Sequence, residues 1–430
     1  MVRTKIFIAS CIFTLLLCCS VAIASDIKCF VLQPPDQALP GVQKLAILDF
    51  NGMGGRAISD YLISSLLVKG RGIGAIKGGL FSKDKEGTTY VSGARTDIFT
   101  IVERSRLDQV LKEQALGATG LVDDKQAAAL GKILGVDAIV MGTIIPSSND
   151  SKGRREQTMY TGGNKYNVVV DCTTRKVSVT VRMRVVNATT GEILGTKEGQ
   201  SEIQDDKCGD ERAQLATVES LVDQCVKFLA DGDLANYLSP HFVQSKFELK
   251  DIKAKDYKKL GEQAGDAAED GKLDKAFTLY SAILKDDPYN DVAYYNLGVL
   301  NEVVGNFSEA DSAYEKAISI RQDDDYTKAS DRCHRMSSFG GMLTTMGISI
   351  QKHPFSVSET QMANATAAKV RLKGDSGDRI SIRSTAEDAA TVLVKVPGGI
   401  ELEMLEKNGN WIKVKTFDGK IGFVKADEIR

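Results

Sequence analysis

A run of alternating apolar residues constrains the fold of this chain more than any other feature. In "KVSVTVRMRVVN" (176–187), every second side chain is apolar and most of those between are polar or charged: the apolar ones are Val177, Val179, Val181, Met183 and Val185. A period of two is typical of a β-strand with one buried face. The turn signal "ATTG" follows, and "EILGTKEGQSEI" (192–203) can return as the partner strand. The sequence therefore predicts an antiparallel hairpin.

The register of this hairpin predicts a disulfide. If Asn187 faces Glu192, then Cys172 falls opposite Lys207, one residue from Cys208. We therefore expect a Cys172–Cys208 bridge. The alternative is that both thiols are free or paired elsewhere. We expect no zinc site, because no CxxC motif and no Cys/His cluster with metal-ligand spacing occurs.

The first residues predict export. "MVRTK" is basic, "IFIASCIFTLLLCC" is apolar and "SVAIAS" ends in small residues, which is the order of a secretory signal peptide (1–24) cleaved before Ser25. A retained anchor is an alternative, but the apolar run is shorter than the roughly 20 residues that span a bilayer. Lipid attachment at Cys18 or Cys19 is another, although Leu17 is bulky where lipoprotein signals usually have a small residue.

Export makes disulfides plausible. The cysteines left after cleavage are odd in number, so at least one lacks an intramolecular partner, and we expect this to be Cys333. The formal net charge is −2 and no block of like charge stands out. This balance argues against a nucleic-acid partner, which normally needs a basic face. The mature length predicts several domains.

The first domain alternates strand and helix patterns. Buried strands are predicted at 44–52, 97–103 and 136–145, and helices at 56–70, 105–117, 124–135 and near 212–232. Together with the hairpin, this order predicts an α/β domain (25–235) whose sheet mixes parallel and antiparallel strands.

Two motifs in this domain could be taken for sites. In "FTIVERSRLDQVLKEQ" (99–114), Ser105 is predicted as a helix N-cap with Asp108 three residues on, a variant of the capping box. Glu103 and Arg104 then lie where a strand gives way to a helix, so we expect a structural pair or an intersubunit contact rather than catalysis. The glycine-rich "GRGIGAIKGG" (70–79) follows a helix and lacks the Lys-Ser/Thr of a phosphate loop. We interpret it as a flexible surface loop.

Four segments together carry a family resemblance: "LAILDF", "IVERSRLDQVLKEQ", "GLVDDKQAAALGKILGVDAIVMGTI" and "RVVNATTGEIL". Over residues 42–232 the chain resembles the curli-production assembly/transport (CsgG-like) family. The resemblance implies a periplasmic domain. The best-known members of that family form an outer-membrane ring, in which each subunit contributes two β-hairpins to a shared barrel that exports protein fibre subunits.

The sequence departs from the family at these hairpins. A membrane-spanning strand needs roughly 9–11 residues with alternating apolar positions. The segment between Pro146 and Lys176 is mostly polar, and its apolar cluster at 168–170 does not alternate. Too few residues follow Ile203 for a second spanning hairpin. We therefore expect the domain to lack the barrel and to act as an oligomerisation or docking platform.

A repeat with a period of 34 residues follows, in which 271–288 aligns with 305–322. The matched positions are Ala264 with Gly298, Gly271 with Gly305, Ala276 with Ala310 and Tyr280 with Tyr314. These small and aromatic positions, where paired helices cross, resemble tetratricopeptide repeats over 256–322. The segment 324–336 can supply a capping helix. The resemblance implies an all-α region (250–336) whose groove holds a peptide or protein; the alternative is a spacer packed on the first domain.

The C-terminal part predicts a small all-β barrel (367–430) after a linker (337–366). Short strand patterns are divided by the turn signals "PGG", "KNGN" and "FDGK". The segments "ISIRS", "VLVKVPGG", "NWIKVKT" and "GKIGFVKADEI" resemble the bacterial Src-homology-3-like (SH3-like) family, which often implies attachment to peptidoglycan or to a protein. We expect Trp411 to pack the barrel. The alternative is that Trp411 and Phe423 line a peptide groove.

Nothing in the sequence indicates catalysis or a cofactor. The histidines are His241, His334 and His353, and no HExxH motif occurs. Cys333 precedes His334, but adjacent residues seldom have the geometry of a nucleophile and its base. We expect no enzyme activity, no cofactor and no bound metal.

We therefore expect a multidomain envelope scaffold in the periplasm or at the periplasmic face of the outer membrane. Its first domain would dock or form homo-oligomers, its repeats would hold a protein partner, and its barrel would tether to peptidoglycan or protein. Such a scaffold would support the assembly or export of a surface structure. The alternatives are a secretion pore subunit and a peptidoglycan-binding regulator of wall enzymes.

Overall fold

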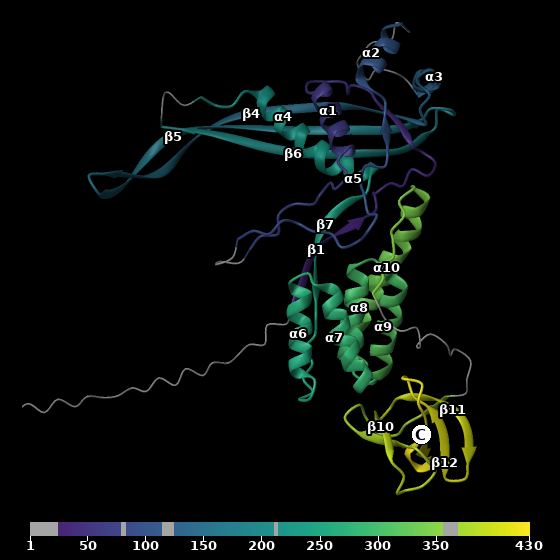
Figure 1. Cartoon of the computed structure of the whole chain (residues 1–430). Coiled ribbons are helices and arrows are strands. Elements are labelled where there is room, and N and C mark those ends of the chain that lie inside the picture. The colour runs from purple at the N-terminus through teal and green to yellow at the C-terminus, as the bar shows by residue number, and fades with distance from the viewer. Residues whose placement is uncertain (1–24, 79–82, 114–123, 210–213, 356–368) are drawn as a thin grey trace, which may run out of the picture.

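The computed structural model describes residues 25–78, 83–113, 124–209, 214–355 and 369–430. The predicted signal peptide and its cysteines lie outside these residues. Figure 1 shows four parts in succession: an α/β domain, a two-stranded ribbon, a block of helices and a small C-terminal barrel. The multidomain fold class is as predicted.

The α/β domain is built on a five-stranded sheet of order β3-β2-β4-β5-β6. Its strands are β2 (Lys44–Ile47), β3 (Thr100–Ile101), β4 (Ala138–Thr161), β5 (Asn164–Asn187) and β6 (Ile193–Cys208). Strand β2 pairs in parallel with β3 and β4, and the other pairs are antiparallel. The predicted mixed sheet is confirmed.

Helices cover both faces of this sheet. One face packs against α1 (Gly55–Leu66), α4 (Val218–Leu229), a π-helical turn (Ala230–Leu234) and α5 (Ala235–Leu238). The alternating apolar side chains of β5 lie in this layer, each at most 2% exposed. The other face packs against α2 (Arg104–Glu113) and α3 (Asp124–Leu134). The period of two in the sequence therefore corresponds to burial under α1 and α4.

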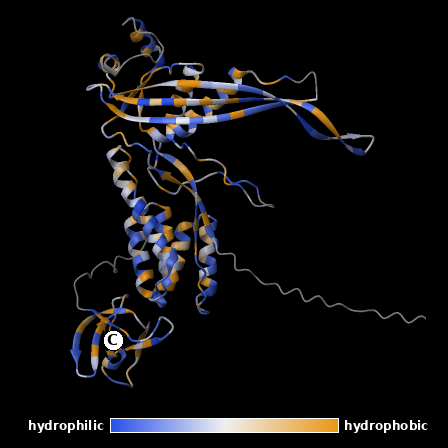
Figure 2. Cartoon of the chain, turned by 180° about the vertical axis from the view of Figure 1, so that it is seen from behind, coloured by the Kyte–Doolittle hydropathy of each residue, from blue (hydrophilic) through white to orange (hydrophobic). Residues whose placement is uncertain are grey.

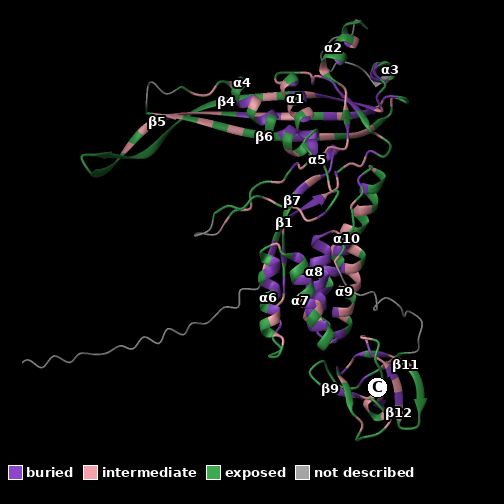
Figure 3. Ribbon diagram, viewed as in Figure 1, coloured by how far each residue is buried: buried purple, intermediate pink, exposed green. Residues whose placement is uncertain are grey.

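Strands β4 and β5 extend far beyond the rest of the sheet. Their pairing continues without a break from Ala138↔Asn187 to Thr161↔Asn164. We call residues 154–171, where no third strand lies beside the pair, the arm. Nearly all its side chains are exposed, on both faces, and it is largely hydrophilic toward its tip (Figures 2 and 3). The polar segment 146–176 thus forms a hairpin, although not one with the alternating apolar positions of a membrane-spanning strand.

A two-stranded antiparallel ribbon connects the α/β domain to the helices. It consists of β1 (Asp26–Gln33) and β7 (His241–Glu248). The sequence pattern does not predict β7, which lies between the expected end of the first domain at 235 and the expected start of the repeats at 250. The ribbon makes residues 26–33 part of the connection between the two modules (Figure 1).

The helical block contains two antiparallel helix pairs and a long final helix. These are α6 (Lys258–Glu269), α7 (Leu273–Asp286), α8 (Asp291–Val303), α9 (Phe307–Ile320) and α10 (Asp324–Thr345). The predicted linker at 337–366 is wrong in its first half, because α10 continues to Thr345 and the chain then packs back, with Phe355 stacked on Phe277 at 4.2 Å between ring centroids. Burial of Leu343 against Phe30 and Phe242 of the ribbon outweighs the low helix propensity of the two glycines before it.

The C-terminal barrel is a six-stranded sheet of order β10-β9-β13-β12-β11-β8. Its strands are β8 (Lys369–Arg371), β9 (Arg379–Arg383), β10 (Val392–Pro397), β11 (Glu401–Asn408), β12 (Trp411–Lys415) and β13 (Ile421–Lys425). The barrel contacts the helical block through Phe417, whose ring lies 5.0 Å from that of Tyr289 and whose N–H donates to the Tyr289 hydroxyl at 3.4 Å.

Candidate protein-interaction sites

The predicted repeat positions lie where the helices cross. Tyr280 and Tyr314 are 1% and 0% exposed, and Ala264, Ala276 and Ala310 are fully buried. A Cβ on Gly298 would lie 2.5 Å from the Tyr314 ring, so only glycine fits there. Gly271 and Gly305 have φ of 77° and 85° in the turns between helices, a conformation that favours glycine.

The chain's own backbone covers α8. Lys250 N–H donates to Asn296 Oδ1 and Asn296 Nδ2 donates to the Lys250 carbonyl, each at 2.9 Å. Tyr295 Oη donates to the Glu248 carbonyl at 3.2 Å. Phe247, Leu249 and Ile252 of the same extended segment are buried. On this face of α8, a segment of the same molecule takes the place that a bound peptide would need.

The buried Glu302 carboxylate joins three helices beside this segment, through an ion pair and a hydrogen bond. Glu302 of α8 is 3% exposed. It accepts from Arg332 Nε and Nη2 at 2.7 and 2.8 Å and from the Tyr314 hydroxyl at 2.7 Å. Burial and the Glu302 charge together raise the pKa of Tyr314, so this hydroxyl stays a donor. The sequence signal that could have located this network is limited to Glu302, an acidic residue near the end of a largely apolar helix.

A charged cleft of about 750 Å³ lies between the ribbon, the helices and the barrel. Its walls include Lys246, residues 248–254, the first turns of α8 and α10, and Arg379 of the barrel. Most of its charges are already paired, as in Arg321 with Asp291 at 2.6 Å and Lys250 with Asp325 at 2.7 Å. The basic Lys253 and Arg379 and the acidic Asp251 and Asp287 form no ion pair with any described residue. This cleft can hold a polar extended ligand, and its volume lies within the usual range for ligand sites.

Trp411 and Phe423 lie on the outer face of the C-terminal barrel. Trp411 pairs with Lys425 and Phe423 with Lys413 on adjacent strands, which places both aromatic side chains on one face. Both are half-buried, whereas Val414 and Val424 on the other face are fully buried. The half-buried Trp411 side chain thus lies on the face opposite the buried core and shares that face with Phe423.

Arg104 has a structural role at the start of α2. Its guanidinium forms ion pairs with Asp49, after β2, and with Asp60 of α1. The predicted cap is wrong by two residues, because α2 begins at Arg104 and Leu107 N–H donates to the Glu103 carbonyl at 3.1 Å. Ser105 and Asp108 lie inside the helix. Glu103 thus precedes the first turn, and Arg104 ties three elements together.

The glycine-rich segment is anchored at its start. Arg71 is 7% exposed, and its Nη2 donates to the carbonyls of Ala235, Ser239 and Pro240 at 3.0, 2.8 and 2.8 Å. Gly72 has φ of 95° and lies so close to Phe242 that a Cβ would be 2.1 Å from its carbonyl oxygen. The interpretation of the whole segment as a flexible surface loop is therefore wrong for its first residues.

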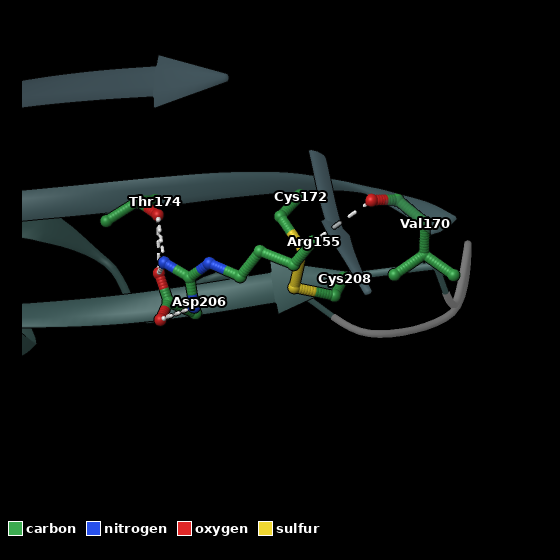
Figure 4. Close-up of a disulfide and its surroundings, with 6 residues drawn as sticks. All are labelled: Arg155, Val170, Cys172, Thr174, Asp206 and Cys208. Atoms are coloured by element: carbon green, nitrogen blue, oxygen red, sulfur yellow. Dashed lines mark hydrogen bonds and ion pairs between the residues drawn. A yellow bond between two sulfur atoms is a disulfide. The ribbon is translucent and has the colours of Figure 1, made fainter. Parts of the chain in front are cut away.

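A disulfide lies at the root of the arm. Cys172 and Cys208 face each other directly and are bonded, with Cα atoms 4.1 Å apart (Figure 4). Asn187 N–H donates to the Glu192 carbonyl, as the predicted register requires, and a β-bulge at Val185–Val186 then shifts the pairing by one residue. Arg155 reaches Asp206 beside the bridge at 2.6 Å. These contacts fix the arm where it leaves the sheet.

The other thiols in the described part of the chain are buried. Cys29, Cys225 and Cys333 are free and buried. Burial, and to a lesser extent the Glu302 charge, raises the pKa of Cys333 to about 12. His334 instead contacts Asp311 at 2.8 Å. Because the thiolate is the reactive form, Cys333 is not an activated nucleophile.

The described part of the chain contains no cluster of three or more His, Cys, Asp or Glu side chains that could hold a metal ion. Among the described residues, no helix is both long and apolar enough to cross a membrane.

Two family models match the chain. Residues 92–231 match the model of the curli production assembly/transport component CsgG, and residues 378–430 match that of the bacterial SH3 domain. The chain contains a CsgG domain and a bacterial SH3 domain. The CsgG match covers α2 to α4 and the arm. It begins after β2, a strand of the same sheet, and after α1, which packs on one face of that sheet. No family match accompanies the helical repeats.

No curated protein matches the chain. Among solved structures, it is similar to the LpoB C-terminal domain from Salmonella enterica, with 11% identity, a TM-score of 0.21 and coverage of 38% of this chain and 84% of that one. It is also similar to lipoprotein GNA1162 from Neisseria meningitidis, with 12% identity, a TM-score of 0.21 and coverage of 42% of this chain and 93% of that one. A third similar structure is a PelC dodecamer from Paraburkholderia phytofirmans, with 10% identity, a TM-score of 0.19 and coverage of 47% of this chain and 96% of that one. At these TM-scores the likeness supports no conclusion about function.

Proposed function

We propose that this protein is a non-enzymatic scaffold of the cell envelope that supports the assembly or export of a surface structure through contacts with other proteins. The observation that carries the proposal is the CsgG domain, whose family description is a component of curli production assembly and transport. In this chain the domain presents an arm exposed on both faces. The ribbon and the repeats connect it to an SH3 domain at the opposite end (Figure 1).

Each module has a role in this proposal. The arm exposes Tyr160, Val169 and Tyr166 at 73%, 68% and 43%, a suitable surface for another protein or another copy of the chain. The SH3 domain binds peptidoglycan or a protein, with Trp411 and Phe423 as the aromatic face. The leader-like first residues and the disulfide support a periplasmic location.

The test is the native mass of residues 25–430 extracted from their own envelope fraction with and without detergent. Release as a small species without detergent supports the scaffold. A large assembly released by detergent alone contradicts it. Purified peptidoglycan incubated with the protein supplies a second measurement: co-sedimentation without loss of turbidity is expected, and loss of turbidity would indicate a hydrolase.

The second candidate is a subunit of a secretion pore. The length of the arm favours it, because two strands of 24 residues each run without interruption into a hairpin that projects from the sheet. Detergent-dependent extraction as a ring, lost when residues 154–171 are deleted, would support the pore over the scaffold.

A further inference from the structure

Strand β7 has one edge that is paired with β1 and one that is not. In an antiparallel pair, the backbone groups of successive residues point alternately to the two edges. Leu249 N–H donates to Ser25 O across the ribbon, whereas Phe242 N–H donates outward to Arg71 O at 2.8 Å. The outward-pointing residues of this segment are therefore Phe242, Gln244, Lys246, Glu248 and Lys250.

Only the ends of this outward edge are occupied. Arg71 bonds the edge at Phe242, and α8 bonds it at the Glu248 carbonyl and at both groups of Lys250. Between them, the backbone groups of Gln244 and Lys246 bond to no described residue, and both residues are exposed. The other edge of the ribbon is less available, because Phe30 of β1 donates to Thr88 O at 2.8 Å.

Two adjoining cavities lie beside the free part of the edge. The smaller, of about 220 Å³, is lined mainly by apolar side chains that include Phe247 of β7 and Met336 and Phe339 of α10. The larger is the charged cleft. Lys246 and Arg332 line both cavities, so an apolar and a charged compartment meet at the unpaired backbone of Lys246.

We propose that this edge binds an extended peptide of a partner protein, which adds to β7 as a third strand. One bulky apolar side chain of the peptide fills the smaller cavity, and polar side chains of the peptide lie in the cleft. The proposal rests on the proposed function and names the class of partner that the scaffold holds. It uses a known mode of recognition, in which main-chain bonds to a sheet edge supply affinity and pockets for alternate side chains supply specificity.

The chemistry of the two compartments defines this peptide. Phenylalanine and methionine side chains line the smaller cavity and can adapt around an aliphatic or aromatic residue. In the cleft, the other basic side chains nearest α8 and α10 are paired with acids of the chain itself, such as Lys250 with Asp325. Lys253 and Arg379 have no ion pair there, and neither have Asp251 and Asp287, so the cleft favours polar peptide side chains of either sign.

The test is binding of synthetic peptides to the full mature chain, followed by fluorescence anisotropy. The probe is a labelled threonine-rich peptide with one phenylalanine near one end, made in both sequence orders. The matched peptides carry alanine for the phenylalanine. We expect one order to bind and the replacement to raise Kd about tenfold or more. Failure of both orders to bind more tightly than the matched peptides would overturn the proposal.

Two variants of the protein distinguish the contribution of the Lys246 backbone N–H to peptide binding from that of the Lys246 charge. Lys246→Pro removes the outward N–H without removing a bond to β1, because proline is tolerated on a free edge. Lys246→Thr keeps the N–H and removes the charge. We expect the proline variant to raise Kd about tenfold and the threonine variant to stay within about threefold. Equal effects of the two would overturn the edge mechanism.

Two controls keep these outcomes interpretable. If Lys246→Pro fails to fold, as judged by circular dichroism, Gln244→Pro removes the neighbouring outward N–H instead. If the protein is released as a small species without detergent but binds no peptide, the scaffold function is supported and the peptide site on β7 is contradicted. If the peptides bind but the protein is extracted as a ring by detergent alone, the scaffold function is contradicted and the peptide site is supported.

Discussion

The side-chain amide of Asn296 holds the backbone of Lys250 at both its donor and its acceptor, with two hydrogen bonds of 2.9 Å. Asn296 is fully buried, so water does not replace these bonds in the folded protein. Through this contact, α8 continues the hydrogen bonding of β7 beyond the end of the ribbon. This face of α8 is therefore occupied by the chain's own segment, and the site that we propose for a partner peptide is the free part of the β7 edge.

We predict that Asn296→Ala destabilises the chain by about 1–3 kcal/mol for each backbone group left without a partner. The measurement is the free energy of unfolding in urea. The matched control is Asn167→Ala on the exposed arm, where Asn167 accepts from the Thr158 hydroxyl at 3.0 Å. This surface change should stay within about 0.5 kcal/mol. Similar values for both variants would contradict a supporting role for Asn296.

We predict that removing the Cys172–Cys208 disulfide costs about 2–4 kcal/mol, because the bridge closes a loop between residues 36 positions apart and limits the unfolded chain. The double variant Cys172→Ser/Cys208→Ser and the reduced wild type should lose the same stability in urea unfolding. Adding reductant to the double variant should change nothing. A wild type that is equally stable when reduced would show that the β5–β6 ladder alone fixes the root of the arm.

We predict that Arg332→Met costs about 3–5 kcal/mol, because it leaves the Glu302 carboxylate buried without its cation. The double variant Arg332→Met/Glu302→Gln should recover most of this loss, since the buried charge is then gone and glutamine can still accept from Tyr314. Lys328→Met is the control, because the Lys328 side chain is 74% exposed. If the double variant is no more stable than the single one, the ion pair is not the cause.

We predict a pH dependence of stability that comes from His241. Burial and the nearby Arg71 guanidinium lower the pKa of His241, against a smaller opposing effect of Asp36, and its Nδ1 is buried without a partner. The unfolded chain then binds this proton more readily, so stability falls as pH drops below about 6.5. Urea unfolding at pH 5.5 and 8 should show a smaller difference for His241→Gln than for wild type. The same difference in both would contradict this assignment.

How much of the fold was predictable depends on whether its signal is local. The period of two in β5 and the 34-residue spacing of Tyr280 and Tyr314 are visible as patterns in the sequence. Burial of one strand face imposes the first, and the repeated crossing of paired helices imposes the second. The turn at Asn187–Glu192 was likewise predictable, and with it the approach of Cys172 to Cys208. The bulge that brings them into direct register was not, since it leaves no pattern in the sequence.

Other features have no local signal. The partners of Arg104 could not be inferred, because Asp49 and Asp60 belong to other elements that only the packed domain brings near it. Trp411 lies on the outer face of its barrel because of the strand register, whereas its apolar character favoured the core. Helix α10 continues through glycines because Leu343 packs on the ribbon.

The sequence by itself determined the modules: an α/β sheet, helical repeats and a small barrel, each specified by side-chain period and turn chemistry. Only the tertiary structure decided how they join. Strands β1 and β7 pair although they lie at opposite ends of the α/β domain in the sequence, and strand pairing at such a distance depends on which surfaces meet when the modules pack. That pairing also decides which edge of β7 remains free, and so where we propose that a partner peptide binds.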